Sequence, residues 1–162
     1  MAMLKRARGA QDRPEEATDA VSLLKADHKK VSLLLEEFEK ATRQSKNSIA
    51  QQICNELSVH AQIEEEIFYP AARAVLGEED DLIDEADVEH ATIKGLVGRI
   101  QTNGSSDEHF EALVKVLGEY VKHHVKEEEG EIFPKVRRSE MDLEATGAEM
   151  ARRKSELQKA RA

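Results

Sequence analysis

The chain has 162 residues, of which 40% are hydrophobic and 35% are charged, with 3 Pro and 8 Gly. This length suits one domain with a sizeable core, and the composition favours a helical protein over a sheet-rich or disordered one. The net charge of −9 argues against nucleic acid or an anionic membrane as a main partner, because both need clustered Lys and Arg. No signal peptide or membrane-spanning apolar run is visible, and the single cysteine, Cys54, cannot form an internal disulfide. We therefore expect a cytoplasmic protein.

Apolar residues recur every three or four positions over four stretches of the chain, which is the spacing of one face of a helix. Ser45, Asn47 and Ser48 interrupt the pattern, and we expect them to lie at a turn and to cap the second helix. Four helices joined by short loops predict an all-α fold, an up-down-up-down four-helix bundle. The four stretches cover residues 20–38, 49–71, 83–100 and 110–132.

The two ends of the chain differ from this central region. Residues 1–17 show no apolar periodicity, so we expect a flexible N-terminal tail before a bundle at residues 18–138. In the C-terminal helical extension, residues 139–162, apolar side chains such as Met150 and Leu157 recur at helical spacing. This segment is either a fifth helix, weakly held on the bundle, or a binding site for a protein partner, whose identity is unknown.

A polar motif occurs twice in the chain. His60-Ala-Gln-Ile-Glu64 returns 64 positions later as His124-Val-Lys-Glu-Glu128, and both copies run into a similar apolar segment that ends in proline. Each copy is also accompanied by a lone histidine that follows an acidic residue. The chain therefore consists of two similar halves, each with one lone histidine and one His-x-x-x-Glu motif. The two lone histidines occur in Asp27-His28 and Glu89-His90, 62 positions apart.

These six histidines and glutamates fall in phase with the apolar faces, so we expect them to point into the core. Buried carboxylates without partners would cost several kcal/mol, so something positive should lie between them. Imidazole nitrogens and carboxylate oxygens are ligands for first-row metals, and six donors are too many for one structural zinc. The pattern indicates two metals, bridged by the glutamates and capped by two histidines each, with a polar metal-free core as the alternative. The candidate ligands are His28, His60, Glu64, His90, His124 and Glu128.

This ordered set of motifs resembles the bacterial hemerythrin-like family, also called the HHE cation-binding domain, over about residues 20–137. The resemblance implies a helical bundle around a non-haem di-iron centre, with the six residues above as ligands. The cofactor it implies is two non-haem iron ions with an oxo or hydroxo bridge, while manganese or zinc stays open on ligand type alone. Open positions on the metals would bind a small diatomic or peroxide ligand.

One position departs from the oxygen-carrying members of the family, which have a further histidine four residues after the third-helix histidine. Here residue 94 is Lys, and the last motif carries Glu128 where the carriers have Asp. This difference disfavours stable oxygen carriage, because one nitrogen donor is missing or replaced by another residue. The resemblance then implies O2 or NO binding in sensing or in an oxidative or nitrosative stress response. The alternatives are a di-iron enzyme that decomposes peroxide or NO, and an iron-buffering or metal-stabilised interaction protein.

Several polar neighbours of these six residues have two interpretations each. His123 is expected to be exposed, with a replacement metal ligand as the alternative. Glu65 belongs either to a solvated acidic face or to the metal site as an additional oxygen donor. Asp27 and Glu89, which precede the lone histidines, either orient an imidazole or are ordinary acids on the helix surface.

Overall fold

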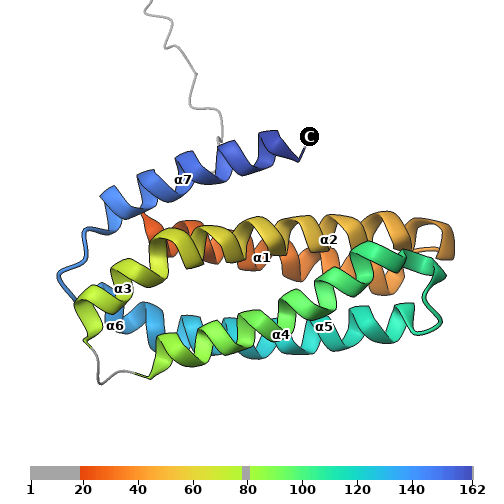
Figure 1. Ribbon diagram of the computed structural model, residues 1–162, viewed down its shortest axis with the longest axis horizontal. Helices are drawn as coiled ribbons and strands as arrows, with labels where there is room; N and C mark the ends of the chain where they lie inside the picture. Colours follow the sequence, from red (N-terminus) through yellow and green to blue (C-terminus); the bar gives the residue numbers. More distant parts are fainter. Residues whose placement is uncertain (1–18, 78–80, 162) are drawn as a thin grey trace, which may run out of the picture.

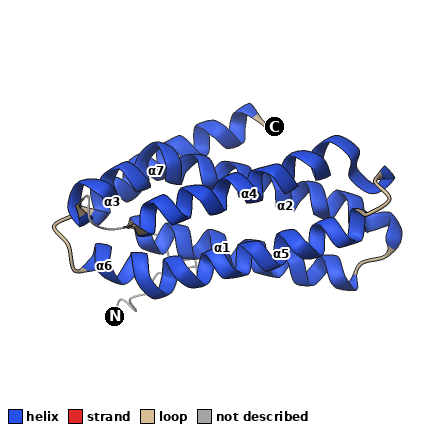
Figure 2. Cartoon of the chain, turned by 60° about the horizontal axis from the view of Figure 1, so that its bottom comes forward, coloured by secondary structure: helices blue, strands red, loops and turns tan. Residues whose placement is uncertain are grey.

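The computed structural model describes residues 19–77 and 81–161, and the expected N-terminal tail lies outside them. The described residues form a bundle of five long helices, two of which contain a π-helical turn (Figures 1 and 2). The all-α prediction with a fifth helix at the C-terminus is therefore confirmed. The elements are α1 (Ala20–Lys40), α2 (Arg43–Ile63), π turn η1 (Glu64–Phe68), α3 (Tyr69–Leu76), α4 (Leu82–Asn103), 3-10 turn η2 (Gly104–Ser106), α5 (Phe110–Glu127), π turn η3 (Glu128–Ile132), α6 (Phe133–Arg137) and α7 (Leu143–Ala160).

The start of α2 differs from the prediction. The helix begins at Arg43, with Thr42 in the N-cap position, so Ser45, Asn47 and Ser48 lie inside the helix rather than before it. These polar residues are tolerated because Ser45 and Ser48 are exposed and Asn47 is half-buried. Asn47 has a different task, since its Oδ1 accepts a hydrogen bond of 3.1 Å from the backbone N–H of Ser105 and thereby ties α2 to the turn after α4.

A π-helical turn begins at the glutamate of each His-x-x-x-Glu motif. In η1 the backbone N–H of Tyr69 donates to the carbonyl of Glu64, five residues earlier, and the next residue is Pro70, which has no N–H to donate. The second half repeats this arrangement, with Phe133 donating to the carbonyl of Glu128. Such turns insert one residue into an α-helix and frequently occur at functional sites. Each helix therefore continues past its proline while the register of its inner face changes at the glutamate.

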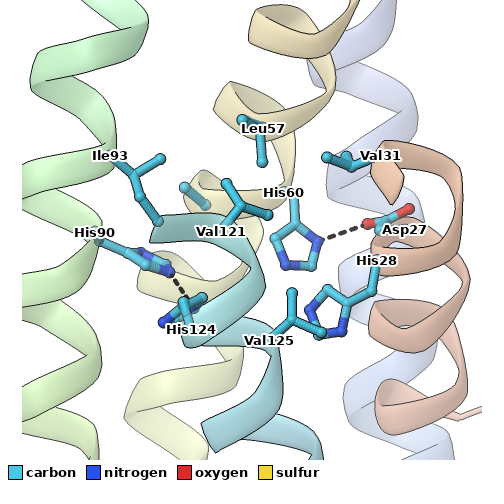
Figure 3. Close-up of a pocket in the computed structure, with 11 residues that line it drawn as sticks. Asp27, His28, Val31, Leu57, His60, His90, Ile93, Val121, His124 and Val125 are labelled. Atoms are coloured by element: carbon cyan, nitrogen blue, oxygen red, sulfur yellow. Dashed lines mark hydrogen bonds and ion pairs between the residues drawn. The ribbon is translucent and has the colours of Figure 1, made fainter. Parts of the chain in front are cut away.

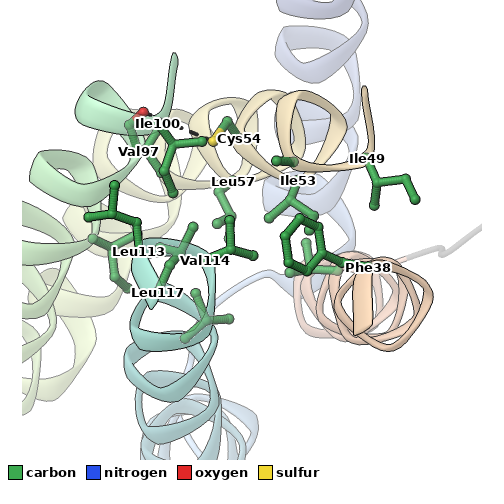
Figure 4. Close-up of a cluster of buried hydrophobic side chains, with 14 of the residues drawn as sticks. Phe38, Ile49, Ile53, Cys54, Leu57, Val97, Ile100, Leu113, Val114 and Leu117 are labelled. Atoms are coloured by element: carbon green, nitrogen blue, oxygen red, sulfur yellow. Dashed lines mark hydrogen bonds between the residues drawn. The ribbon is translucent and has the colours of Figure 1, made fainter. Parts of the chain in front are cut away.

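Two hydrophobic clusters fill the bundle, one toward each end. The first contains Phe38, Ile53 and Leu117 and lies around the α2 and α5 segments shown in Figure 4. The second contains Leu24, Phe68 and further apolar side chains near α3 and α6. On every long helix of the four-helix bundle the proposed histidine ligand lies between residues of the two clusters, so the polar residues form one layer across an otherwise apolar core. No helix in residues 19–77 or 81–161 is long and apolar enough to cross a bilayer.

The C-terminal helix α7 packs against α1 and α2. Asp142 caps its first turn by accepting a 3.0 Å hydrogen bond from the N–H of Ala145, and Met150 is fully buried in the second cluster. Gly147 lies so close to α1 that a Cβ there would be 2.6 Å from the backbone nitrogen of Ala20. Of the two interpretations of this segment, a fifth helix docked on the bundle is the one observed.

Candidate metal centre

All six predicted ligands are buried and meet at one level of the bundle. They come from four different helices, α1, α2, α4 and α5, and the two glutamates are the first residues of η1 and η3. None of the six is more than 8% exposed. Figure 3 shows the four imidazoles grouped around one interior space. The donors form two groups of three whose atoms lie within 4.8 Å of one another: His28, His60 and Glu128, and His90, His124 and Glu64.

Each glutamate lies between histidines of both groups. Glu64 Oε1 is 2.8 Å from His60 Nε2 and 3.4 Å from His90 Nε2. In the other half, Glu128 Oε1 is 2.8 Å from His124 Nε2 and 3.4 Å from His28 Nε2. The equal distances reproduce in space the repeat seen in the sequence. Carboxylates in this position can bridge two metal ions, one on each side.

Several of the polar atoms that face the centre have no hydrogen-bond partner other than one another. Among the described residues these include Nε2 of His28 and of His60, both carboxylate oxygens of Glu64, and Oε1 of Glu128. Buried polar atoms are normally paired, because an unpaired group costs roughly 1–3 kcal/mol. Lone pairs that converge in a buried layer are satisfied by a cation. The donor set therefore fits two metal ions.

The histidines of the two His-x-x-x-Glu motifs are oriented from behind by carboxylates. His60 Nδ1 lies 2.9 Å from Asp27 Oδ2, and His124 Nδ1 lies 2.9 Å from Glu89 Oε1. Because an ionised carboxylate only accepts hydrogen bonds, Nδ1 is the protonated nitrogen and Nε2 is left to face the centre as a donor of electrons. Of the two interpretations of Asp27 and Glu89, orienting an imidazole is the one observed, although each acts on the histidine of a neighbouring helix.

Of the two lone histidines, His28 has a hydrogen-bond partner of the same kind at Nδ1, whereas Nδ1 of His90 has none among the described residues. His28 Nδ1 lies 3.1 Å from Glu129 Oε2, and His90 Nδ1 lies 3.8 Å from Glu65 Oε2. Glu65 also accepts a 2.5 Å ion pair from Lys94, whose side chain is 53% exposed. Lys94 therefore points outward, and Glu65 lies behind an imidazole rather than among the atoms that face the centre.

The pKa shifts of the buried residues indicate which of them are charged when no metal is bound. Burial disfavours charge on His60, but the carboxylates of Glu64 and Asp27 outweigh it and raise the pKa of this imidazole well above its ordinary value of 6.5. Burial likewise opposes charge on His124, yet Glu128 raises the pKa of this histidine to about 9. The pKa of Glu64 is lowered despite its burial, because His60 lies beside it. Protons on the histidines thus supply the positive charge that metal ions would supply.

Tyr69 is a residue of the centre that the sequence reasoning did not assign. Its hydroxyl lies 3.1 Å from His90 Nε2, 3.3 Å from His124 Nε2 and 3.3 Å from Glu128 Oε2, and the residue is 2% exposed. Burial and the two nearby glutamates raise the pKa of the phenol well above its ordinary value of 10. Comparison of the two repeats could have drawn attention to Tyr69. The equivalent residue 64 positions later is Phe133, so this position has a hydroxyl in the first repeat and none in the second.

A small cavity adjoins the four imidazoles. It has a volume of about 20 Å³ for the centre of a water-sized sphere. Such a volume holds about one water or a molecule of similar size, since roughly 10–15 Å³ is the minimum for one water. Apart from the imidazoles and Asp27, the walls are aliphatic, as Figure 3 shows. These apolar residues are Val31, Leu57, Ala61, Ile93, Val121 and Val125.

His123 lies outside the centre. Its side chain is 63% exposed, and its Nε2 is 3.3 Å from Glu89 Oε2 and 3.2 Å from Glu127 Oε1. The ring thus contacts the outer side of the carboxylate that orients His124. The expectation of an exposed histidine agrees with this position, and the alternative of a replacement ligand within the buried layer does not.

Comparison with known proteins agrees with this geometry. Residues 19–136 match the Hemerythrin HHE cation binding domain. The chain belongs to this family. A hemerythrin HHE cation binding domain-containing protein from Mycobacterium kansasii has the same fold in its crystal structure, with a TM-score of 0.73, 23% identity and 88% of each chain covered. A DNA nickase from a Nostoc species is 31% identical over 141 residues, which are 84% of this chain but only 39% of that protein.

Proposed function

We propose that this HHE domain holds two iron ions and binds a small molecule such as O2 or NO at an open position between its two halves, in sensing or in a stress response. The observation that carries the proposal is the convergence of buried imidazole nitrogens and carboxylate oxygens in two groups of three. In this proposal His28 and His60 would hold one iron and His90 and His124 the other, and Glu64 and Glu128 would provide carboxylate oxygens to both ions.

The cavity beside the imidazoles supports a small ligand. Its volume of about 20 Å³ admits a diatomic molecule but no metabolite of ordinary size. The aliphatic wall, which includes Leu57 and Ile93, excludes bulk water and lowers the local dielectric around a ligand. Two bound iron ions would supply the electrons and the open coordination positions. The protein's own groups orient the imidazoles through Asp27 and Glu89 and place the Tyr69 hydroxyl next to His90.

The activity of the nickase relative is not part of this proposal. The chain spans 39% of that protein's length, so a nickase activity can depend on the remainder. The six proposed ligands are at most 8% exposed, and a DNA backbone cannot reach them. The net charge of −9 also opposes association with a polyanion. The absence of a nucleic-acid partner remains a prediction.

Metal analysis of the purified protein tests the proposal. We expect about two irons per chain, as in a two-metal site of this donor set, with a visible absorption band that appears when the reduced protein meets air. Anaerobic titration of the reduced protein with NO should then give a saturable spectral change. A protein that folds without metal and takes up no iron from solution would contradict the proposal. Stoichiometric zinc or manganese in the native protein would keep the site and reject the iron chemistry.

A second function, breakdown of peroxide, is favoured by one observation. Tyr69 places a hydroxyl among His90, His124 and Glu128, so a buried proton donor lies within the centre. Cleavage of an O–O bond needs a proton for the departing oxygen, and a group within hydrogen-bond reach can deliver it. Multiple turnovers of hydrogen peroxide per iron pair would support this function, whereas a single stoichiometric reaction would leave ligand binding as the better description.

A further inference from the structure

Helix α7 reaches the centre through one lysine. Lys154 Nζ donates to Asp27 Oδ1, and the other oxygen of this carboxylate, Oδ2, lies 2.9 Å from His60 Nδ1. The lysine and the aspartate are 127 positions apart in the sequence. A single carboxylate therefore connects the C-terminal helix to an imidazole that faces the centre.

Because Asp27 is buried, its carboxylate depends on the contact with Lys154. The Asp27 side chain is 5% exposed, so water cannot replace a missing partner of its carboxylate. A buried carboxylate that loses one of two charged or polar partners is strongly destabilised. Lys154 itself is 22% exposed, which means that its ammonium reaches the aspartate from the rim of the bundle. Its removal would leave Asp27 free to turn away from His60.

Two further contacts fix the position of α7 against the bundle. The guanidinium of Arg153 holds the Glu66 carboxylate through two nitrogens, at 2.7 and 3.2 Å, and Glu66 lies in η1, two residues after the proposed ligand Glu64. Nearer the N-terminus of α7, Gly147 lies in direct contact with the start of α1. The helix is therefore held in one register, and Lys154 meets Asp27 as a consequence.

The equivalent carboxylate in the second half has no such support within residues 19–77 and 81–161. Glu89 orients His124 at the same distance of 2.9 Å, but in the described part of the chain its outer oxygen meets His123 rather than a lysine or an arginine. The Glu89 side chain is 19% exposed, so water can also solvate it. The lysine contact is thus a property of the His28 and His60 half alone.

We propose that Lys154 is a positioning residue of the metal centre, which acts through Asp27 to hold His60 for metal binding and thereby couples the docking of α7 to metal binding. This inference rests on the proposed two-metal function. Lys154 lies beyond residues 19–136, the part that matches the HHE family, so the family match assigns it no role. Coupling between two events is reciprocal, so bound metal also holds α7 more tightly on the bundle.

Metal affinity of the full chain gives the first test. Ferrous iron is titrated anaerobically against a chromophoric chelator into the wild type, Lys154→Met, Lys154→Arg and the control Arg152→Met. Arg152 lies on the same helix with a side chain that is 72% exposed, so its replacement removes the same charge without touching Asp27. We expect Lys154→Met to weaken binding about five-fold, less than the roughly 10–100-fold typical of groups bonded directly to a ligand. Lys154→Arg restores most of the affinity, and the control stays at the wild-type value.

Two readouts separate positioning from a purely structural role. In the metal-free protein, the imidazole ¹⁵N resonances of His60 should move in Lys154→Met while those of His124 do not. In the wild type, iron loading should slow hydrogen exchange of the α7 amides, and Lys154→Met should remove most of that protection. His124 serves as an internal control because its carboxylate, Glu89, has no contact with α7 in the described residues.

The outcomes distinguish this inference from the proposed function. If the wild type binds no iron, the proposed function fails and this inference fails with it. If the wild type binds iron but Lys154→Met matches Arg152→Met in affinity, the lysine inference alone is overturned. The lysine inference is also overturned if His60 and His124 resonances move equally, if Lys154→Arg does not restore affinity, or if α7 protection is independent of metal.

Discussion

The two halves of the centre have the same donors but different surroundings. In one half, Asp27 behind His60 is buried and is bonded to Lys154 of α7. In the other, Glu89 behind His124 lies near the surface beside the exposed ring of His123. The repeat therefore preserves the groups that face the metals, whereas the groups behind them have diverged.

The aromatic neighbours of the two halves differ as well. Phe133 stacks on His28, with ring centroids 5.8 Å apart and planes within 7° of parallel. Its counterpart in the repeat, Tyr69, tilts against His90 and points a hydroxyl at the metal-facing atoms of the second half. One half is thus closed by a hydrocarbon ring and the other has a proton donor. Two metals in such surroundings would differ in ligand binding even with identical donor atoms.

Removing a bridging glutamate should disrupt metal binding in both halves, and we expect it to have the largest effect on metal content. In Glu64→Ala, the group of His90 and His124 loses its carboxylate and His60 of the other group loses the carboxylate oxygen 2.8 Å from its Nε2, so we expect the protein to retain less than about one metal per chain instead of two. Glu128→Ala should do the same, because the distances around the two glutamates are equal. Metal content by mass spectrometry checks both variants, with the exposed Glu131→Gln as a control. A protein that keeps one full metal in either variant would show that the glutamates do not bridge.

The dependence of stability on pH tests a second shared property, the protons that replace the metals. The raised pKa of His60 and His124 means that the folded, metal-free protein binds these protons more tightly than the unfolded chain does. The stabilisation from His124 is complete below pH 6.5 and is lost as the pH rises through about 9, and that from His60 is lost as the pH rises through the raised pKa of this imidazole. The lowered pKa of Glu64 acts oppositely, since its stabilisation is present above 4.5 and is lost in acid.

The metal-free protein should therefore lose on the order of 2–3 kcal/mol of unfolding free energy between pH 6.5 and 9. Metal competes with the protons, so the stabilisation by metal should grow over the same interval. Urea unfolding with and without iron, at several pH values in this interval, measures both trends. A metal-free protein whose stability is constant from pH 6.5 to 9 would mean that the two histidines are not protonated in the centre.

Replacing the two orienting carboxylates sharpens the difference between the halves. We expect Asp27→Asn to weaken iron binding about 10–100-fold, because the new amide group faces the ammonium of Lys154 in a buried position. Glu89→Gln should weaken iron binding by about 10-fold or less. The surroundings of Glu89 are partly solvated and contain no lysine among the described residues. Chelator competition measures both affinities, and the exposed Glu85→Gln on α4 is the matched control. Equal losses of iron affinity in the two variants would contradict the expected difference between the two halves.

The sequence was sufficient for the parts of this structure that repeat. The period of three to four residues and the 64-residue interval placed six polar residues on apolar faces, and the structure brings all six together. The contact between Lys154 and Asp27 could not be predicted in this way, because it joins a surface helix to the bundle and belongs to neither repeat. The prediction of where α2 begins was wrong. Ser45, Asn47 and Ser48 resemble an N-cap in sequence, but they lie within the continuous helix.

The role of Tyr69 was not predicted from the sequence, for a different reason. Its replacement is expected to have the smallest effect on the centre. A tyrosine in an apolar stretch is most simply interpreted as core, and its hydroxyl gains meaning only from the three polar atoms around it. Tyr69→Phe should keep both metals and lower the unfolding free energy of the metal-free protein by about 1 kcal/mol, the value of a lost buried hydrogen bond. If peroxide is a substrate, kcat should fall with little change in KM, because the proton donor is used in the reaction rather than in binding. Tyr120→Phe removes a hydroxyl from a side chain that is 45% exposed and is the matched control. Should the two variants behave alike in stability and turnover, the hydroxyl would not distinguish the halves, and the asymmetry would rest on Lys154 alone.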